Sequence, residues 1–384
     1  MFWVLPDTNF SETENRSLQS LPKFSLGDYV SGKYQNKLNK YYSDQFITRD
    51  HLINAKTLFM FMLNINENKD EVFAKSGYII SRFDKYSEKS ISEKSSDELG
   101  GNLTYLEYIK NIENNCTYIK LFYENILDLF PDINFTVSVP PRKVDVLKFV
   151  LPAFFPLERH EKFFEAFEFN INPKIYFSLL ETLDSHSSEY IYYKTDHHWT
   201  TLGAYYAYAA LGEKMGYEPL LKSDFEIEIA SNDFYGANWF RAGAKWIKPD
   251  TIEYYNDKKG YVFSTQRHGL ELNIIDGFYD RKKLETNDKY ASFLGGITSH
   301  ISINLDGPET PIPERKKLLL IADSFGQSLA SFLALHYNIE LIDMRFFSAN
   351  IYDFIMEYNI NDILILQNLE SLATQANLAK LTRK

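Results

Sequence analysis

Three adjacent polar residues in the stretch YYKTDHHWTT, residues 192–201, have side chains that can do chemistry. Asp196, His197 and His198 place one carboxylate and two imidazoles in consecutive positions. An imidazole with an unperturbed pKa of about 6.5 can accept a proton at neutral pH. An Asp two residues before a His can turn back and bind the far ring nitrogen, which fixes where the ring proton sits. The spacing predicts that Asp196 orients the ring and that His198 is a general base, with His197 directed toward structure or substrate.

A hydroxyl that such a base could activate lies near the other end of the chain. The segment LLLIADSFGQS places Ser324 where an apolar strand ends near Ala322 and a helix begins after Phe325. A serine hydroxyl is a weak nucleophile and needs a base within hydrogen-bond reach. The helix N-terminus favours negative charge, as the oxyanion of an acyl-transfer intermediate requires. This pattern predicts Ser324 as a nucleophile and its N–H as an oxyanion donor.

Two other interpretations of these residues compete with acyl transfer. Ser and Asp are common helix N-caps, so both segments could serve structure alone. An Asp-His-His triplet also binds manganese in the DHH phosphoesterases. Those enzymes need further Asp motifs, including early Asp-x-Asp pairs after strands, and we find none placed that way. We therefore expect neither a metal nor another cofactor at this site.

The elements that would position these residues are clearest in the last quarter of the chain. Strands alternate there with helices, and this order predicts parallel strands with covered faces. Ligands of such sheets bind beyond the C-terminal ends of the strands, where Ser324 is expected. The expected strands are 316–323, 339–344 and 362–367, and the expected helices are 326–337 and 350–359.

The Asp-His pair is expected at a similar junction of a strand and a helix. Residues 190–195 are predicted to form a strand, and residues 198–216 a helix that Gly216 ends. Earlier in the chain we expect helices at 56–66 and 103–129, a strand pair at 71–83, an exposed Ser, Lys and Glu-rich loop at 84–100, and a strand at 133–141. Residues 220–300 have the glycine punctuation of β-hairpins and loops.

Composition excludes several classes of function. A net charge of −11 argues against binding a nucleic-acid backbone. Cys116 is the only cysteine, so an intramolecular disulfide and a cysteine metal cluster are excluded. No apolar run reaches the roughly 18 residues of a membrane helix. The opening MFWVLPDTNF lacks the basic flank and the apolar length of a signal peptide.

The segment YYKTDHHWTTLGAYYAY resembles the signature of the DHHW-motif proteins. That family is similar to the alginate O-acetyltransferase branch of the SGNH hydrolase-like proteins. The segments FSETENRSLQSLPKFS, SGKYQNKLNKYYSDQFITRD and LLLIADSFGQSLASFLALHYNIELIDMRFF resemble the family as well. The resemblance implies an α/β, SGNH hydrolase-like three-layer fold with a central, mostly parallel sheet and β-hairpin or loop insertions. It also implies that Asp196 orients His198 and that Ser324 is the nucleophile.

We divide the chain on this basis. Residues 1–69 are predicted to be an N-terminal wrapping segment, and residues 70–384 an SGNH hydrolase-like catalytic domain with an insertion around residues 220–300.

Two further segments, DFYGANWF and FLGGITSH, also resemble the family. The second has Gly295-Gly296-Ile297 where the family pattern reads Gly-Gly-Asn. If that Asn is an oxyanion donor, this chain lacks it, and the donors would be the N–H groups of Ser324 and Gly296. Losing one such donor costs about 3 kcal/mol in the transition state.

Four residues are candidates for contacts with substrate. Arg345 follows a strand and could grip an anionic group or form a salt bridge at the strand end. Tyr235 and Trp199 could stack on sugar rings, although Trp199 could equally pack under the helix. The fourth candidate is His197, which lies next to the proposed base His198.

The resemblance implies an extracytoplasmic protein, at the cell surface or in the periplasm, held to a membrane by a segment outside this chain. It would acetylate an exopolysaccharide or a cell-wall glycan, with acetyl groups supplied by a membrane-bound O-acyltransferase. Whether sugar or water collects the acetyl group, and so whether the enzyme is a transferase or an esterase, stays open from sequence. The alternative is a catalytically degenerate carbohydrate-binding or scaffold protein of a polysaccharide modification or export complex.

Overall fold

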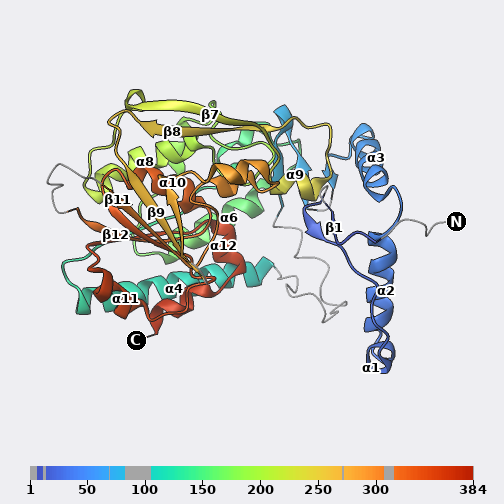
Figure 1. The fold of residues 1–384 in the computed structure, drawn as a ribbon, viewed down its shortest axis with the longest axis horizontal. Coiled ribbons are helices and arrows are strands. Elements are labelled where there is room, and N and C mark those ends of the chain that lie inside the picture. The colour runs from blue at the N-terminus through green and yellow to red at the C-terminus, as the bar shows by residue number, and fades with distance from the viewer. Residues whose placement is uncertain are drawn as a thin grey trace.

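The computed structural model describes residues 7–11, 14–68, 70–82, 105–269, 272–306 and 315–383 (Figure 1). The loop predicted at residues 84–100 lies outside these ranges. The α-helices are α1 (Leu26–Val30), α2 (Lys33–Asp44), α3 (Arg49–Met62), α4 (Tyr105–Leu129), α5 (Lys143–Val146), α6 (Leu157–Asn170), α7 (Leu180–Ser185), α8 (Thr201–Met215), α9 (Ala237–Ala242), α10 (Phe325–Leu333), α11 (Ile351–Tyr358) and α12 (Leu369–Thr374). The strands are β1 (Phe10–Ser11), β2 (Arg16–Ser17), β3 (Glu67–Asn68), β4 (Glu71–Phe73), β5 (Ile79–Ser81), β6 (Asn134–Ser138), β7 (Phe225–Phe234), β8 (Asp250–Asp257), β9 (Phe263–His268), β10 (Asn273–Asp276), β11 (His300–Leu305), β12 (Lys317–Ala322), β13 (Asn338–Ile342) and β14 (Asp362–Leu366).

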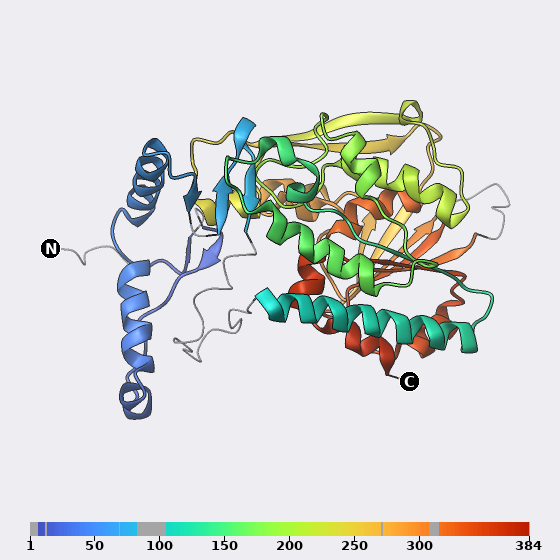
Figure 2. The same cartoon turned by 180° about the vertical axis from the view of Figure 1, so that it is seen from behind.

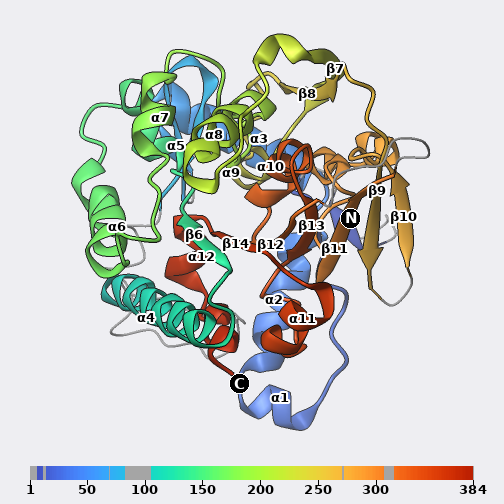
Figure 3. The same ribbon diagram turned by 90° about the vertical axis from the view of Figure 1, so that its left-hand side faces the viewer.

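A seven-stranded sheet forms the centre of the molecule, in the order β10-β9-β11-β13-β12-β14-β6. Figure 3 looks across it from β6 to β10. The strands β13, β12, β14 and β6 pair in parallel. Their sequences, such as KLLLIA and DILIL, are continuous apolar runs, as expected for strands covered on both faces. The predicted alternation of strands and helices in the last quarter is therefore confirmed.

The prediction of a mostly parallel sheet is wrong, because the sheet is mixed. The strands β10, β9 and β11 pair antiparallel, and β11 joins β13 antiparallel as well. The sequence predicted hairpin insertions here, but these strands extend the central sheet. Within the described part of residues 220–300, only β7 and β8 pair in a separate antiparallel sheet. Pairing with β11 satisfies backbone groups of β13 that an edge strand would leave open.

Helices cover both faces of the sheet. The residues of β12 alternate between the faces: Leu318 and Leu320 pack in one cluster with side chains of α8 and α10, and Leu319 and Ile321 in another with side chains of α4 and α11. Figures 1 and 2 show α8 and α10 above the sheet and α4 and α11 below it. The strand that carries Ser324 at its end is therefore held in the most buried part of the fold.

The N-terminal residues lie at one end of the molecule. In Figures 1 and 2, α1, α2 and α3 stand beside the body that holds the sheet. Asn68 ties this end to the body, since its side-chain amide donates to the carbonyl of Ala242 at 2.8 Å. The predicted strand pair after it is present as β4 and β5. The domain boundary at residue 70 stays a prediction. Among the described residues, no helix has the length and apolar character needed to span a membrane.

Candidate active site

Ser324 stands at the junction of β12 and α10, as the sequence predicts. It is the N-cap residue of α10. The preceding carboxylate holds the turn: Asp323 Oδ1 accepts the N–H of Phe325 at 3.0 Å, and its Oδ2 accepts the N–H and the side-chain amide of Asn368 at 2.8 and 2.7 Å. The N–H of Ser324 has no hydrogen bond to the described part of the chain, so it is free to act as a donor in the first turn of the helix.

The segment that carries the Asp-His pair differs from its prediction. Residues 190–195 form no strand; Tyr192 makes only an isolated antiparallel bridge with Trp199. Helix α8 begins at Thr201, and the Thr200 hydroxyl caps it by accepting the N–H of Gly203 at 3.3 Å. His198 therefore lies in the loop ahead of the helix, and Gly216 ends that helix as predicted.

Buried side chains make the hydrogen bonds to this loop that a neighbouring strand would make in a sheet. The carboxylate of Asp250 accepts the N–H of Lys194 at 2.8 Å and the N–H of Thr195 at 2.7 Å. The ammonium group of Lys143 donates to the carbonyl of Tyr193 at 3.0 Å. Burial lowers the pKa of Lys143 to about 8. These partners lie in distant parts of the sequence. The β-rich composition of the loop therefore predicted a strand that does not form.

Asp196, His198 and Ser324 form a continuous chain of hydrogen bonds. Asp196 Oδ1 lies 2.5 Å from His198 Nδ1, and His198 Nε2 lies 2.7 Å from Ser324 Oγ. Asp196 is also held by backbone donors: Oδ1 accepts the N–H of His198, and Oδ2 accepts the N–H of Ala237, each at 2.9 Å. Because Nδ1 faces a carboxylate, the ring proton belongs there, and the lone pair of Nε2 points at the hydroxyl. The structure thus brings together the three residues that the sequence singled out.

The surroundings keep Asp196 ionised at neutral pH. Burial acts to raise the pKa of Asp196, but the imidazoles of His197 and His198 and the hydrogen bonds from His198 outweigh it and hold that pKa well below its usual range. For His197, burial and the nearby charge of His198 lower the pKa of the imidazole. Near pH 7 an ionised Asp196 therefore lies beside a neutral His197.

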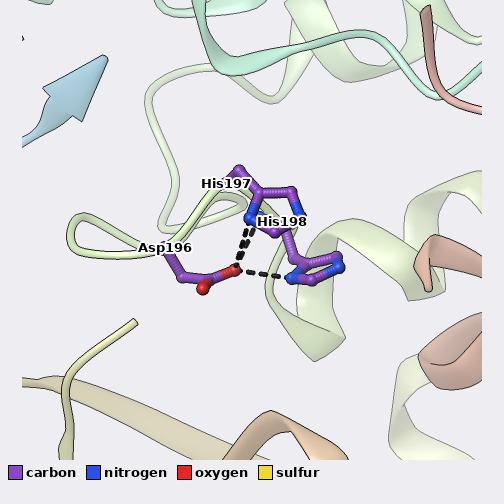
Figure 4. Close-up of side chains that lie close together, drawn as sticks. All are labelled: Asp196, His197 and His198. Carbon is purple, nitrogen blue, oxygen red and sulfur yellow. Dashed lines mark hydrogen bonds and ion pairs between the residues drawn. The ribbon is translucent and has the colours of Figure 1, made fainter. Parts of the chain in front are cut away.

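His197 does not point away from the pair. Its ring centre lies 3.9 Å from that of His198, and its Nδ1 lies 3.5 Å from Asp196 Oδ1 (Figure 4). The three side chains could each offer a ligand atom to one metal ion. A cation there would compete with the bond from His198 Nδ1 to Asp196, and His198 Nε2 already faces Ser324. The donor set suits proton transfer better than it suits metal binding.

The hydroxyl of Ser324 and the ring of His198 line a cleft of about 300 Å³. Three of the predicted substrate contacts, Tyr235, Arg345 and His197, line the same cleft. The guanidinium of Arg345 also binds the carboxylate of Asp343, with Nε 2.9 Å from Oδ1. The salt bridge at the strand end is therefore present, and contact of Arg345 with an anionic group of a substrate stays a prediction.

Two predicted site residues have other roles. Trp199 is 0% exposed and its Nε1 donates to Ser328 Oγ at 2.8 Å, so it packs under the helix and cannot stack on a sugar. The N–H of Gly296 donates to the carbonyl of Phe293 at 3.1 Å. Gly296 lines the cleft, but its N–H is used within its own turn and is not free for an oxyanion.

Several residues that line the cleft were not among the predicted site residues, and Tyr290, Asn15 and Gln327 are three of them. Tyr290 stacks on the His198 ring, with centroids 3.8 Å apart and planes at 6°, and its hydroxyl donates to the carbonyl of Ser324 at 3.3 Å. Asn15, from the turn between β1 and β2, and Gln327, on α10, also line the cleft. Only Gln327 had a sequence signal, its place one helical turn after Ser324. Tyr290 and Asn15 reach the site through long-range packing.

Comparison with known proteins supports the family resemblance. The family model described as DHHW protein matches residues 164–342, a stretch that contains Asp196, His198 and Ser324. The resemblance to DHHW proteins is thereby confirmed. None of the curated proteins compared with the sequence matches it.

Two solved structures, with TM-scores above 0.5, show that the fold is shared. A DHHW family protein from Eubacterium siraeum superposes with a TM-score of 0.59 at 23% identity, covering 71% of this chain and 88% of the other. PatB1 from Bacillus cereus, with a sulfonyl adduct, superposes with a TM-score of 0.56 at 19% identity, covering 71% and 93%. The O-acetyltransferase domain of AlgJ from Pseudomonas putida gives a TM-score of 0.48 at 11% identity, covering 82% and 99%.

Proposed function

We propose that this protein, whose sequence resembles the DHHW proteins, is an SGNH-type acyl-transfer enzyme, an O-acetyltransferase or acetylesterase of an extracellular or cell-wall polysaccharide. The observation that carries the proposal is the hydrogen-bond chain from Asp196 Oδ1 to His198 Nδ1 at 2.5 Å and from His198 Nε2 to Ser324 Oγ at 2.7 Å. A carboxylate, an imidazole and a hydroxyl in this order form the arrangement that activates a serine nucleophile.

The first half of the reaction forms an acetyl-enzyme. His198 Nε2 takes the proton of Ser324 as Oγ forms a bond to the carbonyl carbon of an acetyl ester, and the π electrons of the carbonyl move to its oxygen. When the tetrahedral intermediate collapses, the bond to the leaving oxygen breaks and His198 returns the proton to that oxygen. Acetyl-Ser324 and a free alcohol result. Asp196 stays ionised and stabilises the imidazolium, in agreement with its low pKa.

The second half of the reaction passes the acetyl group to an acceptor. A sugar hydroxyl or a water molecule gives its proton to His198 as its oxygen attacks the acetyl carbon. When this second tetrahedral intermediate collapses, the bond from the acetyl carbon to Ser324 Oγ breaks and His198 returns the proton to Oγ, which releases the acetylated sugar or acetate. The cleft favours a sugar acceptor, because Tyr235 and Arg345 line it and offer an aromatic face and a guanidinium. The family resemblance supports a reaction outside the cytoplasm and a membrane-bound O-acyltransferase as the source of acetyl groups.

Ester turnover tests the proposal. Purified protein is incubated with p-nitrophenyl acetate, and nitrophenol release is compared for wild type, Ser324→Ala and His198→Ala. Each variant is expected to lose nearly all turnover. Ser331→Ala, which alters another buried serine of α10, and His186→Ala, at a partly exposed histidine, are matched controls that should retain it. Wild-type turnover no faster than that of Ser324→Ala contradicts the proposal.

One observation favours a second candidate, a catalytically degenerate glycan-binding protein. Ile297 stands where the family pattern has Asn, and the neighbouring Gly296 N–H is bonded to Phe293. Such a protein would bind glycan oligosaccharides in the cleft without ester turnover. Calorimetry with wild type and Tyr235→Ala, run beside the ester assay, separates the two. Binding that depends on Tyr235 in the absence of Ser324-dependent turnover favours this candidate.

A further inference from the structure

Gln327 is a buried amide in the cleft with no assigned role. It lines the same cleft as Ser324 and His198, and it is 3% exposed. Its backbone N–H donates to the Ser324 carbonyl at 3.2 Å. Its side-chain amide, in contrast, makes no hydrogen bond to any residue within the described ranges. This amide is therefore available to a ligand bound in the cleft.

The position of Gln327 on its helix directs this amide toward the reacting hydroxyl. Residues three apart share a helix face, and Cα–Cβ bonds tilt toward the helix N-terminus. The side chain of Gln327 therefore extends over the first turn of α10, where Ser324 is the N-cap residue. The amide carries two N–H donors, and the oxyanion of an acyl-transfer intermediate must form beside Ser324 Oγ.

Several groups of the cleft that could supply a donor are engaged or absent. The N–H of Gly296 is bonded to Phe293, and the Arg345 guanidinium binds Asp343. Ile297 carries no side-chain donor. The N–H of Ser324 is free, but an oxyanion is usually stabilised by more than one donor. An oxyanion beside Ser324 therefore needs a second donor, and the Gln327 amide lies in the same cleft without a hydrogen-bond partner in the described part of the chain.

We propose that Gln327 is a catalytic residue that donates a hydrogen bond from Nε2 to the carbonyl oxygen of the acyl group on Ser324. This inference rests on the proposed acyl transfer and supplies its second oxyanion donor. As Oγ bonds to the acetyl carbon, the carbonyl π electrons move to oxygen, and the N–H groups of Gln327 and Ser324 bind the charge. No proton leaves Gln327 in this step.

The test compares Gln327→Met, which keeps length but removes the donor, with wild type. The rate constant of acetyl-enzyme formation, read from the nitrophenol burst with p-nitrophenyl acetate, is expected to fall about 100-fold, while KM changes by less than about threefold, since the bond strengthens only in the transition state. Gln327→Glu, which presents acceptors at neutral pH, is expected to be slower still.

Thermal unfolding separates this role from a structural one. Because Gln327 has no protein partner, Gln327→Met should melt at the same temperature as wild type or higher. The matched control is Gln367→Met: Gln367 is 8% exposed, and its amide donates to the carbonyl of Ile321 at 3.4 Å, so this variant should melt lower.

The outcomes distinguish failure of the role proposed for Gln327 from failure of the proposed acyl transfer. Turnover lost in Ser324→Ala but retained within threefold in Gln327→Met overturns the role of Gln327 and leaves acyl transfer standing. A Gln327→Met variant that is slow but also melts several degrees lower identifies a structural residue and overturns it too. If wild type hydrolyses no ester, the rate of Ser324 sulfonylation by phenylmethylsulfonyl fluoride replaces the burst. Absence of both reactions overturns both proposals.

Discussion

Gly236 is the residue whose replacement tests the positioning of Asp196 most sharply. A Cβ at this position would lie 2.1 Å from Asp196 Cβ and 2.4 Å from its Oδ2. The φ of Gly236 is −92°, which other residues adopt without strain, so a side chain is excluded only by lack of space. Non-bonded carbons keep about 3.5–4.0 Å apart, so Gly236→Ala must displace one partner by roughly 1.5 Å. That movement breaks the bond from Ala237 N–H to Asp196, now 2.9 Å, and strains the bond to His198.

The magnitude follows from the role proposed for Asp196. A misplacement of about 1 Å in a catalytic group costs about 10²-fold, and loss of the carboxylate in a serine triad costs about 10⁴-fold. We therefore expect kcat for p-nitrophenyl acetate to fall by about 10²- to 10⁴-fold in Gly236→Ala. Overpacking should also lower the free energy of unfolding by about 1–3 kcal/mol, read from urea denaturation.

The control for this variant is Gly27→Ala in helix α1. A Cβ there meets only Ser25 Oγ, at 3.9 Å, so kcat should stay unchanged and the helix should gain slightly in stability. A folded Gly236→Ala enzyme with kcat within threefold of wild type would refute the reasoning, because it would show that turnover does not depend on the position of this carboxylate.

Four further outcomes are expected. Asp196→Asn should lower kcat about 10⁴-fold at unchanged fold, because an amide cannot both fix the His198 tautomer and stabilise its charge; circular dichroism and steady-state kinetics check this. Lys143→Met should lower the free energy of unfolding by about 1–3 kcal/mol, because it leaves the Tyr193 carbonyl without that donor; unchanged urea midpoints would contradict it. The pKa values of Asp196 and His197 are lower in the folded chain than their usual ones. The free energy of unfolding that these two groups contribute is therefore fully present above about pH 6.5 and is lost as pH falls. Urea midpoints should drop between pH 7 and pH 4, and by less in His197→Phe. EDTA should leave ester turnover unchanged, since both nitrogens of His198 bind protein atoms; a chelator that abolishes turnover would indicate a metal.

The elements that could be predicted are those whose sequence pattern matches their burial in the folded chain. The segments KLLLIA and DILIL are apolar throughout because they are covered on both faces, and β12, α10, β13, α11 and β14 lie within a few residues of their predicted bounds. Residues 190–195 have an equally β-rich composition, but Asp250 and Lys143 satisfy their backbone groups. No pattern within the segment reveals partners about 50 positions away.

The candidate site divides in the same way. Asp196, His198 and Ser324 were found because residue type, spacing and family resemblance all indicated them, and the structure brings them within hydrogen-bond distance. The expectation for Gly296 failed because its N–H closes a local turn on Phe293, which a pair of glycines does not reveal. The stacking of Tyr290 on His198 depends on three-dimensional packing alone.

The most direct test of the account is the site of the covalent intermediate. Wild-type protein is mixed with p-nitrophenyl acetate, quenched in acid within the burst phase and digested for peptide mass spectrometry. The account predicts one acetyl group, on Ser324, absent from His198→Ala. Acetyl transfer that continues with no label on Ser324, or with the label on another side chain, would contradict it.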